Sequence, residues 1–145
     1  FKNEQDLMGA SSHGVGYGSF VCQQPDHWVF ANTGMKKGDS ISNLVGWEYH
    51  GRPAGQAKDL VVLAETKPDP LHFGSSNPQN YLATIYTMPA GNFVFNAGTC
   101  WWVQPLAKTP AYQHPHKMRE TIDFSNPDQR VQQMTKNLLD RIIKQ

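Results

Sequence analysis

The fold of this chain is decided by residues 81–97, which read YLATIYTMPAGNFVFNA. Two runs rich in β-branched and aromatic residues flank a turn-forming Pro-Ala-Gly, so the segment predicts a β-hairpin. In the second run Phe93 and Phe95 point to one face and Val94 to the other, because side chains alternate along a strand. Both faces of the sheet are therefore expected to be covered, which requires helices packed against it.

Further strands are expected at residues 20–22, 44–49 and 60–65, where short apolar runs end in Gly, Pro, Asn or Asp. Residues 1–19 become rich in glycine and are expected to form a flexible opening segment. Three prolines among polar residues mark 68–79 as a loop. These features indicate one α/β domain.

The last segment predicts a helix over residues 127–144. Residues 125–126 offer a cap, and Pro127 fits the first helical position. Asp128 lies at the positive end of the helix dipole and Arg141 near the negative end. Apolar residues recur at spacings of three and four, at Val131, Met134, Leu138 and Ile142, joined by Leu139 and Ile143. We therefore expect this helix to dock on the domain through a wide apolar face.

Composition limits the classes of partner. A chain of 145 residues suits one domain and is too short for two ordinary ones. Thirteen basic and twelve acidic residues give a net charge of +1 without a Lys/Arg-rich run, so nucleic-acid binding is not expected. The longest apolar runs have the length of strands, so no membrane-spanning segment is expected. Cys22 and Cys100 lack CxxC spacing and fit either a disulfide or two thiols, which leaves the compartment open.

Two polar and aromatic stretches, residues 25–39 and 44–51, contain the candidates for chemistry. In the second stretch Glu48 and His50 lie on one face of the expected strand and Tyr49 on the other. A carboxylate and an imidazole side by side suit general acid/base work or metal ligation.

Each of these candidates also has a purely structural interpretation. Glu48 can form a salt bridge with Arg52 at the surface. The ring of His27 can be fixed in a tight turn by Asp26 or by a backbone carbonyl, and His50 is similar.

Other conspicuous side chains favour structural roles. His114 and His116 flank a proline and are expected to be solvated. Trp101 and Trp102 are expected to pack in the core. Cys100 lies at a strand-to-helix turn, but the second glycine of a nucleophile elbow is missing, so a catalytic thiol is not expected.

Residues 25–39, 44–51, 91–102 and 128–139 together carry a resemblance to a known family. Over residues 7–143 the chain resembles the C-terminal portion of proteins related to the large subunit of N,N-dimethylformamidase. More distantly it is similar to trehalose-utilisation proteins with a class I glutamine-amidotransferase-like fold. The phenylalanine-rich strand is the most specific part of the resemblance.

The resemblance implies a three-layer α/β domain with a mixed, amidotransferase-like (flavodoxin-like) sheet, of which this chain holds all or the C-terminal part. It also implies a metal-assisted amide hydrolase, with an iron bound by tyrosines and a glutamate in dimethylformamidase itself. The upstream segment that supplies tyrosine ligands in the family has no counterpart in this chain. Glu48 is the one residue that the resemblance places near a metal, either iron or another divalent cation.

We therefore expect hydrolysis of a small amide or related C–N bond. The metal would act as Lewis acid and source of hydroxide, with Glu48 as ligand or base and His27 or His50 carrying the proton.

The alternative is a non-catalytic binding or assembly module. In this interpretation Trp28, Trp47 and Tyr49, with Asp26, present an aromatic surface to a carbohydrate or a partner subunit. Because the chain begins at Phe1 and lacks the upstream half of the resembled domain, we expect a processed chain or fragment that works as an oligomer or with a partner chain.

Overall fold

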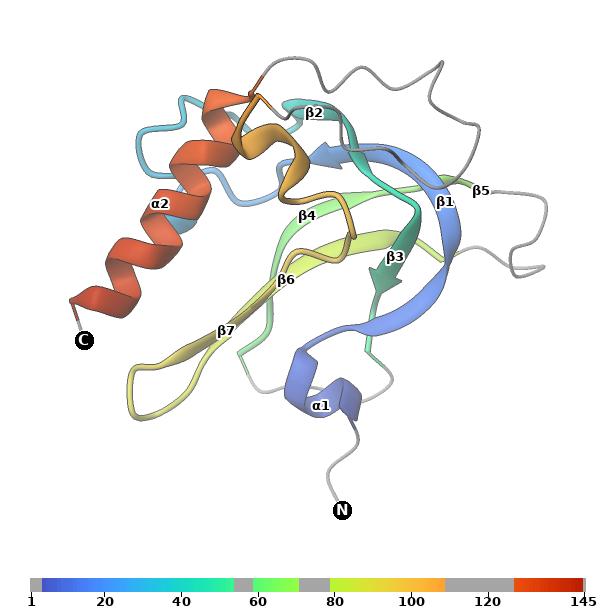
Figure 1. Cartoon of the computed structure of the whole chain (residues 1–145). Helices are drawn as coiled ribbons and strands as arrows, with labels where there is room; N and C mark the ends of the chain where they lie inside the picture. The colour runs from blue at the N-terminus through green and yellow to red at the C-terminus, as the bar shows by residue number, and fades with distance from the viewer. Residues whose placement is uncertain (1–3, 54–58, 71–78, 109–126, 145) are drawn as a thin grey trace.

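The computed structural model describes residues 4–53, 59–70, 79–108 and 127–144. Its central element is the long strand β1 (Ser11–Val21), which pairs antiparallel with β2 (Ser40–Val45), β3 (Glu48–Gly51) and the short β5 (Asp69–Pro70). Irregularities of register interrupt the pairing of β1 with β2 and with β3, and bulges of this kind bend a strand. Figure 1 shows the resulting curvature of β1.

A second antiparallel sheet contains β4 (Val61–Thr66), β6 (Tyr81–Thr87) and β7 (Phe93–Asn96), with β6 in the middle. All five residues at the start of β6, from Tyr81 to Ile85, are buried, as expected of a central strand.

Two isolated bridges connect the sheets. Cys22, directly after β1, pairs with Ala64 in β4, and Tyr49 in β3 pairs with Thr99, which follows β7. Backbone pairing therefore forms a closed circuit. It runs from the end of β1 to β4, then to β6 and β7, and the segment after β7 pairs with β3, which pairs with β1. Such closure leaves fewer unpaired strand edges than two separate sheets would have.

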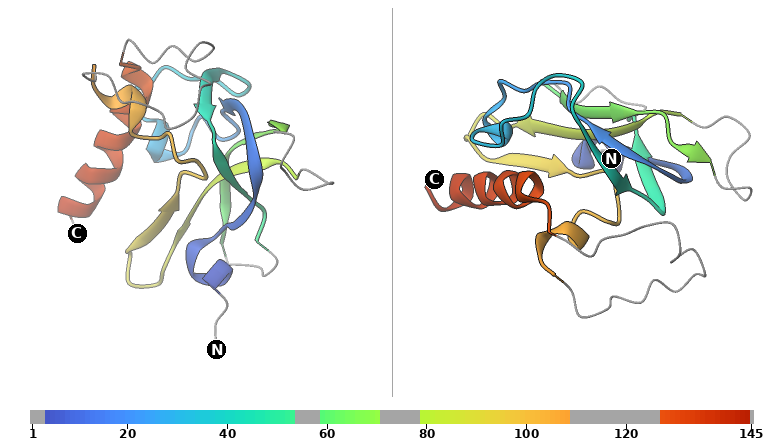
Figure 2. Two further views of the ribbon diagram at one scale, coloured as in Figure 1. Left: turned by 45° about the vertical axis from the view of Figure 1, so that its right-hand side comes forward. Right: turned by 90° about the horizontal axis from the view of Figure 1, so that it is seen from above.

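Helix α2 (Gln129–Ile143) lies along one side of the strands, as Figure 2 shows. It packs against two short 3-10 helices, η1 (Trp28–Phe30) and η2 (Gln104–Leu106). A short N-terminal helix, α1 (Glu4–Met8), contacts β1 and β7. The buried residues of α2 are Val131, Met134 and Leu138.

One hydrophobic core joins both sheets to α2. Burying a large apolar side chain contributes roughly 1.5–3 kcal/mol, so this shared core is a major source of stability. Its fully buried side chains include Phe20, Leu44, Tyr49, Leu63, Tyr81, Ile85, Val131 and Met134.

The predicted hairpin and the predicted terminal helix are confirmed. β6 and β7 pair antiparallel, and the N–H of Met88 donates to the carbonyl oxygen of Asn92 at 2.7 Å across the turn. Helix α2 is capped by Asp128, whose carboxylate accepts the N–H of Arg130 at 2.8 Å. The cap expected at residues 125–126 lies outside the described residues.

The opening segment expected to be flexible at residues 1–19 instead contains helix α1 and most of strand β1. A Cβ on Gly16 would lie 2.6 Å from the carbonyl oxygen of Asp69 in the paired strand. A Cβ on Gly14 would lie 3.2 Å from the hydroxyl oxygen of Tyr49. These two glycines therefore allow neighbouring groups to approach β1 closely.

The strand expected at residues 44–49 is divided between β2 and β3. Gly46 lies at the division, where its N–H donates to Oγ1 of Thr99 at 3.1 Å. The ring of Trp101 packs so closely on Gly46 that a Cβ would overlap it. Trp101 is buried and Trp102 is half-buried against the core, as the sequence predicts.

Mixed helix and strand content and a C-terminal helix are present, but the amidotransferase-like architecture is not confirmed. Every pairing between the described strands is antiparallel, whereas a flavodoxin-like sheet needs parallel strands joined by crossover helices. Two residues separate β2 from β3 and five separate β6 from β7, which is too few for a crossover helix.

The apolar face expected along the whole of α2 is buried only in part. Leu139, Ile142 and Ile143 are 54%, 58% and 82% exposed, so the C-terminal end of the helix presents apolar side chains to its surroundings. Within the described residues, no helix has both the length and the apolar character needed to cross a bilayer.

Candidate functional site

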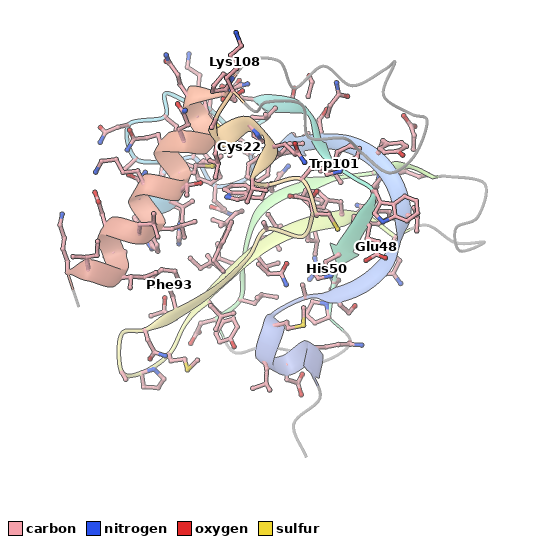
Figure 3. The ribbon with its side chains drawn as sticks, viewed as in Figure 1. Cys22, Glu48, His50, Phe93, Trp101 and Lys108 are labelled. Atoms are coloured by element: carbon pink, nitrogen blue, oxygen red, sulfur yellow. The ribbon has the colours of Figure 1, made fainter. Side chains whose placement is uncertain are left out.

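Strand β3 presents Glu48 and His50 on one face, as the alternation predicts (Figure 3). Glu48 is exposed and His50 is half-buried, whereas Tyr49 between them is 1% exposed and packs in the core. Strand alternation therefore puts the carboxylate and the imidazole on the same face of β3, opposite Tyr49. Tyr49 does not lie on the surface that the binding-module interpretation gives it.

The ring of His50 is held by Asn96, the last residue of β7. Nδ1 of His50 lies 3.2 Å from Oδ1 of Asn96, and the same oxygen accepts the backbone N–H of Gly98 at 2.8 Å. The backbone N–H of His50 donates to the carbonyl oxygen of Gly98 at 2.9 Å. Three hydrogen bonds thus join His50, Asn96 and the turn after β7 in one unit.

Gly98 is closely packed at this junction. Its φ is +66°, and a Cβ there would overlap the carbonyl oxygen of Leu82 and lie 2.8 Å from the ring of Tyr81. The next residue, Thr99, donates from its hydroxyl to the carbonyl oxygen of Leu44 at 2.9 Å. The turn that carries Asn96 is therefore bonded to both sheets.

His27 caps the short helix η1 rather than facing Glu48. Its Nδ1 accepts the backbone N–H of Val29 at 3.4 Å. Burial, and then the nearby charge of Arg141, lower the pKa of His27 below its ordinary value of 6.5. The ring therefore has a structural role in a tight turn, but its partner is a backbone N–H and not Asp26 or a backbone carbonyl as the sequence suggested.

The two candidate histidines lie at opposite ends of β7. Trp28, next to His27, packs edge-to-face on Phe93 at the start of β7, with ring centroids 5.2 Å apart. His50 contacts Asn96 at the end of the same strand. Sequence reasoning grouped the histidines, but the structure places only His50 beside Glu48.

The proposed aromatic surface is divided among different elements. Trp28 is half-buried on η1, and the guanidinium carbon of Arg141 lies 5.2 Å from the centre of one of its rings. Asp26 is exposed in the preceding turn, whereas Trp47 is half-buried between β2 and β3. Trp28 is therefore the member of this set that lies next to α2.

The tyrosines beside the site are not arranged as metal ligands. Tyr49 points to the opposite face of β3 from Glu48, and Tyr81 donates its hydroxyl to the carbonyl oxygen of Ala97 at 2.8 Å. Burial raises the pKa of Tyr49 and of Tyr81, whereas metal binding requires the deprotonated phenol. Within β3, Glu48 and His50 are the residues on this face whose side chains can bind a metal.

Asn96 is the functional candidate that sequence reasoning missed. Its signal was an Asn two residues before a glycine that needs positive φ, a pattern in which the Asn side chain accepts a nearby backbone N–H. That pattern identifies the turn but not His50, which lies 46 residues earlier in the sequence.

The remaining candidates have structural roles or lie outside the described residues. Cys22 is a buried free thiol whose pKa burial raises, and Cys100 is an exposed free thiol. His114 and His116 lie outside the described residues.

Comparison with known proteins addresses the resemblance directly. A search of curated proteins returned no match. The family model described as N,N-dimethylformamidase beta subunit-like, C-terminal, matches residues 1–117. The relation to the large subunit and the more distant likeness to trehalose-utilisation proteins both stay predictions. Because the match covers well over half of the 145 residues, this chain belongs to the N,N-dimethylformamidase beta subunit-like, C-terminal family.

Proposed function

We propose that this chain contributes the Glu48–His50 face to the hydrolysis of a small amide, in an enzyme related to N,N-dimethylformamidase. The observation that carries the proposal is the orientation of His50, whose ring is bonded to Asn96 beside an exposed carboxylate. Membership of the family supports the reaction class.

Amide hydrolysis needs a group that takes a proton from the attacking water and returns one to the leaving nitrogen. We assign this role to Nε2 of His50, because Nδ1 is engaged by Asn96. Glu48 lies two residues earlier on the same face, where its carboxylate can accept a hydrogen bond from the attacking water. The hydroxyl of the water ends in the carboxylic acid, and its proton leaves with the amine.

We further propose that a partner chain completes the site. The family is described as beta subunit-like, which suggests an enzyme of more than one chain. Groups that stabilise the oxyanion are also required for amide hydrolysis, and a partner chain is the source we propose for them.

Assembly is the second candidate function, and it rests on a different surface. The C-terminal end of α2 exposes three apolar side chains, Leu139, Ile142 and Ile143. Arg141, in the same part of the helix, contacts the ring of Trp28. Exposed clusters of large apolar side chains commonly mark protein interfaces. In this function the chain holds a catalytic subunit without supplying groups to the reaction.

The test compares His50→Asn with His27→Asn in the chain assembled with its partner, using N,N-dimethylformamide and other small amides as substrates. We expect His50→Asn to lower kcat by roughly 10²–10⁴, the usual contribution of general acid/base catalysis. His27→Asn is the matched control, because asparagine also caps helices and His27 lies away from Glu48. Equal, undiminished turnover in both variants would leave assembly as the function.

A further inference from the structure

Asn96 contacts the ring of His50 through its side-chain amide. Its side-chain atom nearest His50 also receives the backbone N–H of Gly98 at 2.8 Å. Because a backbone N–H can only donate, that side-chain atom must be the amide oxygen and not the nitrogen. The orientation of the Asn96 amide is therefore settled by Gly98, independently of His50.

An amide oxygen cannot donate a hydrogen bond, so Nδ1 of His50 must be the donor in the 3.2 Å contact. We infer that Asn96 is a positioning residue that holds neutral His50 in the tautomer with the proton on Nδ1. Nε2 then carries the free lone pair, on the face of β3 that also carries Glu48.

This inference deepens the proposed function and rests on it for its catalytic meaning. A neutral imidazole accepts a proton only at the nitrogen that lacks one. Without the Asn96 oxygen the two tautomers of His50 would exchange freely, and part of the population would present an N–H where the acceptor is needed. Asn96 raises the fraction of the productive tautomer without touching the substrate.

The surrounding backbone keeps this arrangement from relaxing. The N–H of His50 is bonded to the carbonyl oxygen of Gly98 at 2.9 Å, so the ring and its acceptor belong to the same junction. Gly98 itself is confined by Leu82 and Tyr81, as described above. Movement of the Asn96 backbone away from His50 would disturb the hydrogen bonds that this turn makes with both sheets.

The experiment is a long-range ¹H–¹⁵N NMR spectrum of the ring nitrogens, at a pH where the histidines are neutral. In the wild-type chain, assembled with its partner, we expect His50 to show a protonated Nδ1 and an unprotonated Nε2. Asn96→Ala should shift the population toward the Nε2-protonated form. Asn96→Asp, which keeps an acceptor for both Gly98 and His50, should restore the wild-type pattern.

Asn92→Ala is the matched control, because Asn92 lies in the same hairpin and bonds Met88 rather than His50. It should leave the His50 spectrum unchanged. A wild-type His50 with its proton on Nε2 would overturn the inference, as would an Asn96→Ala protein that is folded and keeps the wild-type pattern. The spectrum does not depend on turnover. If His50 carries its proton on Nδ1 but the assembled chain is inactive, the inference about Asn96 stands and the proposed function is contradicted.

Discussion

The backbone N–H of His50 donates to the carbonyl oxygen of Gly98 at 2.9 Å, which joins the strand of the candidate site to the turn after β7. Asn96, the last residue of β7 before this turn, is the partner of the His50 ring. Stability and site geometry are therefore linked through Gly98.

Gly98→Val should destabilise the protein strongly. Positive φ alone costs a residue with a side chain about 1–2 kcal/mol, and the overlap with Leu82 adds to it. The matched control is Gly91→Val, because Gly91 also has positive φ, but in the described part of the chain no atom beyond its two chain neighbours lies within 4 Å of a Cβ there. Thermal melts should show a clearly larger loss for Gly98→Val, and a Gly98→Val protein with normal stability would refute this description of the turn.

Leu138→Asp should destabilise the protein by at least the roughly 2–5 kcal/mol typical of truncating a buried leucine to alanine. Leu138 is 7% exposed on the docked face of α2, so the change also buries an unpaired charge. Ile143→Asp is the control, since Ile143 is 82% exposed. Urea denaturation measures both, and equal midpoints for the two variants would mean that α2 does not dock through this face.

Acid should weaken the start of α2. The hydrogen bond from Arg130, with a nitrogen–oxygen distance of 2.6 Å, holds the pKa of Asp128 below its ordinary value of 3.8. A carboxyl with a lowered folded-state pKa contributes stability above the unfolded pKa, and that stability is lost as pH falls through the folded value.

We therefore expect the melting temperature of the wild type to fall below about pH 4 more steeply than that of Asp128→Asn. Asparagine keeps the helix cap but carries no titrating charge. If the melting temperatures of the two proteins fall equally with pH, Asp128 does not cause the loss of stability in acid.

The exposed end of α2 should matter for association and not for folding. Ile142→Glu should weaken binding to the partner chain while changing the free energy of unfolding by no more than about 0.5 kcal/mol, because Ile142 is exposed. Analytical ultracentrifugation with and without the partner measures this, with the neighbouring Lys144→Glu as control. A 16.3 kDa monomer with full turnover would contradict the expectation that this chain needs a partner chain or a second copy for activity.

The sequence predicted those features whose signal is local. The hairpin around Gly91 and the helix ending at Ile143 follow from turn residues and periodicity over a few residues. The shared face of Glu48 and His50 follows from strand alternation alone. Each needs no knowledge of distant parts of the chain.

Features that depend on tertiary neighbours could not be predicted. The glycines of β1 were expected to form a flexible segment. The groups that require their small size, such as the Asp69 carbonyl and the Tyr49 hydroxyl, lie far away in the sequence. The division of the 44–49 run at Gly46 likewise depends on Thr99 and Trp101. Strand direction also depends on distant neighbours. The mixed sheet was therefore expected from the family resemblance alone, and the antiparallel pairing was not predicted.

The most direct test of the account is a double-mutant cycle on Glu48 and His50, measured as kcat for a small amide in the assembled enzyme. If the two side chains act together in proton transfer, Glu48→Gln and His50→Asn should each lower kcat, and the double variant should be little worse than the more damaging single variant. Wild-type turnover in both single variants, or losses that simply add in the double variant, would contradict the claim that this face of β3 performs the chemistry.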